Sequence, residues 1–131
     1  MPARKLISLH HLVNEVVTDV LPFAVQRRTL IINDVQPGLD VNINEQQLTS
    51  LLKNLLCETI MNTQDDCLRV MAKAFNAITL VHVRNNDFRS EQIITANLQQ
   101  FEGIAEQLGG CLSVTKNKLY GASVSFTFLN L

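Results

Sequence analysis

The sequence lacks the features of several common protein classes. No apolar run reaches the roughly 18 residues that a membrane helix needs, and no signal peptide is recognisable at the start. An excess of basic residues is also absent, because the sequence has 11 Lys and Arg residues and 12 Asp and Glu residues, for a net charge of -1. Electrostatic binding of nucleic acid needs a basic face. We therefore expect a cytoplasmic protein with no nucleic-acid partner and no membrane contact.

Cysteine is scarce as well. Cys57, Cys67 and Cys111 are odd in number and form no CxxC pair. Neither a disulfide framework nor a zinc site is indicated by such spacing. Reduced thiols in a cytoplasmic protein are the simpler interpretation.

Motifs for nucleophilic or metal catalysis are absent too. The sequence contains no GxSxG, no HExxH and no phosphate-binding P-loop motif. The adjacent acids Asp65 and Asp66 follow a predicted helix, where a turn is more typical than a metal site. We therefore assign no catalytic residue from motifs alone.

The chain does have the size and composition of one globular domain. It has 131 residues, of which 47% are hydrophobic. We expect a single domain over residues 6–131, and residues 1–5 are interpreted as a linker or as the start of an excised fragment. No internal repeat and no low-complexity segment divides the chain.

Three segments show the apolar spacing of amphipathic helices. The first begins at Ser8, and Pro22 is expected to kink or interrupt it before a last turn to Gln26. The second begins at Asn44, which resembles an N-cap with Gln47 three residues on. The third covers residues 94–108, and Gly109-Gly110 is expected to end it as a C-cap.

The remaining segments predict strands. We expect them over residues 29–35, 41–43, 68–74 and 77–84 and in a final hairpin from Cys111 to Leu131. A polar loop is predicted over residues 85–92. His82 alternates with two valines, which favours a position on the open face of a sheet. The order α-β-β-α-β-β-α-β-β predicts a two-layer α/β sandwich, in which three helices cover one face of a mixed, mostly antiparallel sheet.

Four stretches in this order resemble the catalytic and ATP-binding domain of sensor histidine kinases, within the group that includes gyrase B, Hsp90 and MutL. They are "ISLHHLVNEVV", "VNINEQQLTSLLKNLLCETI", "ITLVHVRNND" and "FEGIAEQLGGCLSVTKNKLYGASVSFTFL". The second resembles the N-box helix of the family, and the third resembles the strand that leads into its D-x-G-x-G box. The resemblance implies the sandwich fold and a nucleotide site.

Several positions depart from the family pattern. The first N-box asparagine is kept at Asn54, but the second, which helps to hold Mg²⁺, falls at Glu58. The adenine-reading aspartate falls at Asn85, and the two box glycines fall at Asp87 and Arg89. The following interval is short, and residues 89–97 contain no G-x-G sequence to cradle phosphates. We therefore interpret Asn54, Glu58, Asn85 and Asp87 as a vestigial nucleotide site, with Glu58 as a possible metal ligand.

Three functions are compatible with the family resemblance. The leading hypothesis is a C-terminal histidine-kinase-like domain of a bacterial two-component protein, inactive in isolation, which acts through protein interaction and needs no cofactor. Its partner is expected to be a response regulator or a kinase subunit, and the full-length protein could be a homodimer. The alternative is a divergent but working domain that binds ATP and Mg²⁺ and supplies phosphoryl groups to a phosphoacceptor His elsewhere. A weaker third hypothesis is a binding module of the anti-sigma-factor type.

Overall fold

The first helix forms as its apolar spacing predicts. The computed structural model describes residues 6–85, 99–117 and 121–130, and α1 spans Leu9–Gln26. The Ser8 side chain accepts a hydrogen bond from the backbone N–H of His11, which caps the helix start. Pro22 lies inside α1, which continues to Gln26 as expected. Val20 and Ala24 are fully buried on either side of the proline, so core packing favours the helix there.

The second helix, α2, spans Glu45–Met61. The side chain of Asn44 accepts a hydrogen bond of 2.9 Å from the backbone N–H of Gln47, so the predicted N-cap is confirmed. One stripe of α2 is buried throughout its length, through Leu48, Leu51, Leu52, Leu55, Leu56, Thr59 and Ile60. This apolar stripe fixes which side of α2 faces the sheet and leaves a polar stripe beside it.

Five strands form the main sheet, in the order β2-β4-β5-β7-β6. They are β2 (Leu30–Asn33), β4 (Cys67–Phe75), β5 (Ile78–Asn85), β6 (Gly110–Asn117) and β7 (Gly121–Leu129). Only β2 and β4 pair in parallel, and the other three pairs in this sheet are antiparallel. Two short strands, β1 (Ile7–Ser8) and β3 (Asp40–Val41), form a separate antiparallel pair. The predicted α/β sandwich with a mixed, mostly antiparallel sheet is confirmed.

The third helix is shorter in its described part than predicted. A 3-10 turn, η2 (Gln99–Phe101), leads into α4 (Glu102–Gln107), and the predicted start near residue 94 lies outside the described residues. Gly109 adopts a φ of 78° and donates its N–H to the Glu106 carbonyl oxygen at 2.9 Å. This left-handed residue after the last turn is the predicted C-cap.

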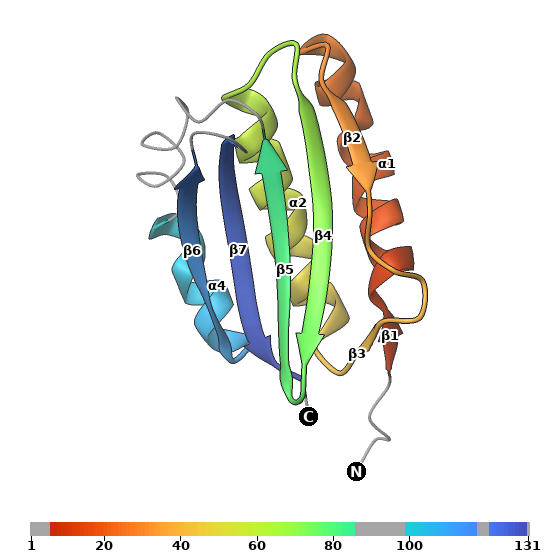
Figure 1. Cartoon of the computed structure of the whole chain (residues 1–131), viewed down its shortest axis with the longest axis vertical. Coiled ribbons are helices and arrows are strands. Elements are labelled where there is room, and N and C mark those ends of the chain that lie inside the picture. Colours follow the sequence, from red (N-terminus) through yellow and green to blue (C-terminus); the bar gives the residue numbers. More distant parts are fainter. Residues whose placement is uncertain (1–5, 86–98, 118–120, 131) are drawn as a thin grey trace.

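The helices α1, α2 and α4 all lie on one face of the sheet (Figure 1). Side chains that alternate along the strands fill the space between the two layers, for example Leu68 and Val70 of β4 and Phe126 and Phe128 of β7. The other face carries no helix among the described residues, and we call it the open face. In the three central strands, its side chains include Arg69, Met71, Lys73 and Phe75 of β4, Ile78, Leu80, His82 and Arg84 of β5, and Ser123, Ser125, Thr127 and Leu129 of β7.

Candidate functional site

Helix α2 supplies two of the predicted site residues. Asn54 and Glu58 are both half-buried and lie one helical turn apart, beside the buried leucine stripe. Glu58 is engaged by a residue that the sequence interpretation missed. The Asn62 side chain donates to the Glu58 backbone oxygen at 2.8 Å and to its Oε1 at 3.3 Å. The i, i+4 spacing of Glu58 and Asn62 is the signal that could have found this contact.

Asn85 occupies a different environment from the predicted one. The sequence predicts that residues 85–92 are a polar loop, but Asn85 is the last residue of β5 and is 1% exposed. The prediction was wrong at this position because pairing with β7 continues to Asn85, which lies opposite Ala122. A residue whose backbone is hydrogen-bonded to the neighbouring strand stays in the sheet even where its side chain is polar.

The buried amide of Asn85 makes a contact with β7. Its Oδ1 accepts a hydrogen bond from the backbone N–H of Ala122, at a long distance of 3.4 Å. An asparagine side chain has one acceptor oxygen, whereas a carboxylate at this place would offer two charged oxygens. The acceptor capacity available to a ligand is therefore smaller with Asn85 than with an aspartate.

The other predicted residue, Asp87, lies outside the described residues, as does the interval that follows it. The second half of α2 and the C-terminal end of β5 lie at the same end of the sandwich (Figure 1). Asn54, Glu58 and Asn85 thus come from two elements that flank this end. Their assignment to a nucleotide site stays a prediction.

A metal ion at Glu58 would need most of its ligands from elsewhere. In residues 6–85, 99–117 and 121–130, no group of three His, Cys, Asp or Glu side chains gathers in a way that could hold a metal. Mg²⁺ prefers six oxygen ligands in octahedral geometry and is usually bound through one or two carboxylates plus substrate phosphates. The Glu58 carboxylate fits as one such ligand, but its charge would also lie close to the phosphate oxygens and repel them.

Two titratable groups near these elements have shifted pKa values. Burial raises the pKa of the Cys57 thiol on α2, and Glu58 adds to this effect while Lys53 opposes it. On the open face, burial lowers the pKa of His82, and the positive charges of Arg84 and Lys73 lower it further. Cys57 is therefore a protonated thiol at neutral pH, and His82 is a neutral imidazole.

None of the helices in the described part of the chain is long and apolar enough to cross a membrane. The sequence matches no protein-family model and no curated protein.

Solved structures of similar shape do exist. The nucleotide-free catalytic domain of the histidine kinase ThkA is 15% identical, with a TM-score of 0.79 and coverage of 96% of both chains. The histidine kinase AdeS of Acinetobacter baumannii is 11% identical, with a TM-score of 0.80. That match covers 96% of this chain and 66% of the AdeS chain. The fold is that of the catalytic domains of histidine kinases.

Two further structures hold a partner or a nucleotide analogue. ThkA in complex with the response regulator TrrA is 15% identical, has a TM-score of 0.79 and matches over 97% of this chain and 42% of that one. Full-length ShkA in complex with AMPPNP is 17% identical, has a TM-score of 0.76 and matches over 97% of this chain and 32% of that one. These likenesses concern the fold, because the sequence identities are low.

Proposed function

We propose that this chain is a histidine-kinase-like domain of a cytoplasmic two-component signalling protein whose nucleotide site has eroded and which acts mainly through protein interaction. The observation that carries the proposal concerns Asn85, to which the resemblance assigns the adenine-reading position. Asn85 is 1% exposed, and its carbonyl oxygen accepts a hydrogen bond from the backbone N–H of Ala122. A neutral amide that is already hydrogen-bonded to the sheet is a poorer acceptor for the adenine amino group than a carboxylate.

The position of the second N-box asparagine supports the same conclusion. Glu58 places a carboxylate where the family has a neutral amide, and this carboxylate already accepts a hydrogen bond from Asn62. Each charge-assisted hydrogen bond that is lost weakens binding by about 1.5 to 3 kcal/mol. Losses at both Glu58 and Asn85 together lower affinity by several orders of magnitude.

Protein interaction is supported by an apolar patch on the open face. The side chains of Phe75, Ile78 and Leu129 are 69%, 47% and 58% exposed. Scattered apolar residues are common on protein surfaces, but a contiguous patch is typical of an interaction site. A response regulator is the expected kind of partner by analogy with the ThkA complex, and a kinase subunit is the other expected kind.

The alternative, a divergent domain that binds ATP and Mg²⁺, has one specific observation in its favour. Asn54 is kept on the N-box helix and is half-buried there, one turn from a carboxylate that suits Mg²⁺. Under this alternative, Asn54 and Glu58 would hold the metal and its phosphates, and the bound nucleotide would supply the phosphoryl group.

Ligand-linked unfolding distinguishes the two functions. A ligand at 100 times its dissociation constant stabilises the folded state by about 2.7 kcal/mol. We expect millimolar ATP with Mg²⁺ to leave the unfolding midpoint of the wild-type domain unchanged. A rise of several degrees that disappears in the Asn54→Ala and Asn85→Ala variants would instead establish the nucleotide-binding function. Lys53→Ala, on the exposed side of α2, is the matched control.

A further inference from the structure

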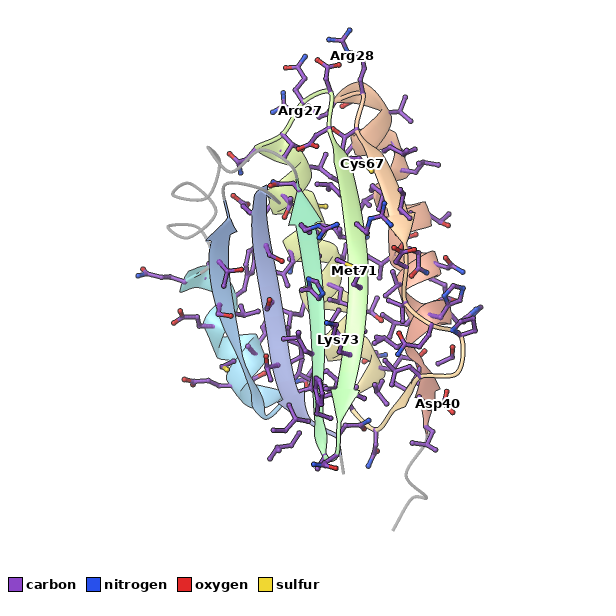
Figure 2. All side chains as sticks on the ribbon, viewed as in Figure 1. Arg27, Arg28, Asp40, Cys67, Met71 and Lys73 are labelled. Atoms are coloured by element: carbon purple, nitrogen blue, oxygen red, sulfur yellow. The ribbon has the colours of Figure 1, made fainter. Side chains whose placement is uncertain are left out.

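The two outer strands of the sheet, β2 and β6, differ in how their free edges are protected. β2 has 4 residues, packs against α1 and is flanked in sequence by the charged residues Arg28 and Asp34. Figure 2 shows Arg27 and Arg28 at the end of the sandwich where β2 begins. Short length, nearby charge and a covering helix are common devices that keep an edge strand from pairing with another chain.

Strand β6 has few of these devices. It has 8 residues and no proline, and its single charged residue, Lys116, comes just before its end. Its pairing with β7 runs without interruption from Gly110 opposite Phe128 to Asn117 opposite Gly121, so no β-bulge twists the edge away. Within the described residues, β7 is the only strand that pairs with β6. The outward backbone N–H and C=O groups of β6 are therefore available to a further strand.

The side chains of β6 show that its inner face is only partly covered. Leu112 and Val114 pack against the core but are half-buried. Their cross-strand partners on β7, Phe126 and Val124, are 0% and 2% exposed. The difference follows from position, because β7 has a strand on each side and β6 has one. A strand added at the free edge would complete the burial of Leu112 and Val114.

A cavity opens at this edge, where α4 packs beside β6 (Figure 1). Its volume is about 190 Å³, and its lining consists of Glu102, Ala105 and Glu106 of α4 and Gly110, Cys111 and Leu112 of β6. Neighbouring residues of a strand point to opposite faces, so a cavity lined by both Cys111 and Leu112 lies at the edge of the strand. Glu102 and Glu106 are exposed, and neither forms an ion pair with a described residue.

We propose that the free edge of β6 binds an extended segment of a partner protein as an added strand. Apolar side chains of this segment pack against Leu112 and Val114, and a Lys or Arg binds at Glu102 and Glu106. In strand addition, backbone hydrogen bonds give affinity and alternating side chains give specificity. The inference rests on the proposed role in protein interaction, and it does not require that the nucleotide site be eroded.

Charge selects a basic segment of another protein over a second copy of this chain. A two-fold axis that pairs β6 with β6 also brings the two α4 helices together, because each α4 packs beside its own β6. Glu102 and Glu106 of the two copies would then approach one another, and like charges across an interface are unfavourable. A lysine or arginine from a different chain meets the same carboxylates with a favourable charge.

The test titrates three synthetic peptides into the isotope-labelled full chain and follows the backbone amide signals by NMR. The first is an extended peptide of about nine residues, with lysine at both ends and alternating threonine and valine between, so that lysines and valines share one face. The second carries glutamine in place of both lysines. The third has proline at two adjacent central positions, which removes a backbone donor from whichever edge of the peptide pairs. We expect the first to bind most tightly and the third not to bind.

An added strand has a signature in the amide protons of β6. Every second N–H group of this strand points away from β7, and in the complex these groups acquire carbonyl partners. We therefore expect the first peptide to shift the signals of β6 and α4 and to slow hydrogen exchange at alternate residues of β6. Shifts confined to other elements, unchanged exchange in β6, or equal binding of the proline peptide would overturn the proposal.

Two matched variants test the charge contact. Glu102→Gln should weaken binding of the lysine peptide about threefold and leave binding of the glutamine peptide unchanged. Glu45→Gln is the control, because Glu45 is likewise an exposed glutamate in the first turn of its helix, and it should change neither. An equal effect of Glu102→Gln on both peptides, or an effect of Glu45→Gln as large, would overturn the assignment of the basic residue.

Other results have distinct meanings. If the free chain self-associates in sedimentation and Ser113→Lys on β6 disperses it, the occupant is a second copy and the proposal fails. Binding of ATP to the same sample would refute erosion of the nucleotide site and leave the binding edge of β6 intact. Protection of β6 by the lysine peptide without any binding of ATP would support both proposals.

Discussion

Gly110 offers the sharpest prediction about the fold, because its place at the start of β6 leaves no room for a side chain. A Cβ atom there would lie 2.3 Å from the Thr127 backbone oxygen and 2.6 Å from Cε1 of Phe126. The oxygen belongs to the neighbouring strand β7, and Gly110 itself pairs with Phe128. The strands β6 and β7 cannot separate without loss of the hydrogen bonds between them. Because the clash is with a backbone oxygen, rotation of a side chain cannot relieve it.

The expected cost of Gly110→Ala follows from this geometry. Overpacking of a well-packed site costs about 1 to 3 kcal/mol, and contact with an immobile backbone atom puts this site at the upper end. Gly103 in α4 is the matched control, because a Cβ there would meet nothing within 4 Å. Gly103→Ala should stabilise the protein by about 0.5 to 1 kcal/mol through helix propensity.

Urea denaturation followed by far-ultraviolet circular dichroism measures both changes, and it suits a chain with no tryptophan. In thermal unfolding followed by the same signal, a loss of 3 kcal/mol lowers the melting temperature by about 10 °C in a protein of this size. The slope of the free energy with urea should be the same in all three proteins. The reasoning is refuted if Gly110→Ala is as stable as the wild type, or if both substitutions shift stability in the same direction.

Two further predictions concern the shifted pKa values. Alkylation with iodoacetamide at neutral pH should modify the exposed Cys111 well before the half-buried Cys57, whose raised pKa keeps it a thiol, and mass spectrometry reports the order. Reaction at Cys57 first would contradict this. His82 has a lowered pKa in the folded state, so the unfolded chain binds more protons near pH 6 and stability falls as pH drops below about 6.5. The His82→Gln variant should lose less stability between pH 7.5 and pH 5.5, as measured by urea denaturation at each pH, and an equal loss would contradict the prediction.

The sequence predicted most of the fold because its signals are local. The leucines of α2 repeat with helical spacing, Asn44 caps the helix through its own side chain, and Gly109 ends α4 in a left-handed conformation. The predicted place of His82 on the open face is also confirmed, since it pairs with Met71 and Ser125. The signal that predicts each of these features lies in residues that are close in sequence.

The features that were missed depend on residues that are distant in sequence. The parallel pairing of Leu30 with Cys67 cannot be derived from either strand alone. The sequence predicts Asn85 as the first residue of a polar loop. Only its pairing with Ala122 in β7 shows that it belongs to β5. The chemistry of the predicted site has the same limit, because the Asn85 side chain accepts its hydrogen bond from the backbone of Ala122, which is distant in sequence.

The most direct test of the central claim is isothermal titration of the domain with ADP and with an ATP analogue, each with and without Mg²⁺. A histidine kinase domain that binds nucleotide serves as the positive control. The eroded site predicts no heat of binding at millimolar nucleotide from a sample whose circular dichroism shows it to be folded. Sub-millimolar binding that Mg²⁺ strengthens, and that Asn54→Ala and Asn85→Ala each weaken, would contradict the claim and assign the domain a working nucleotide site.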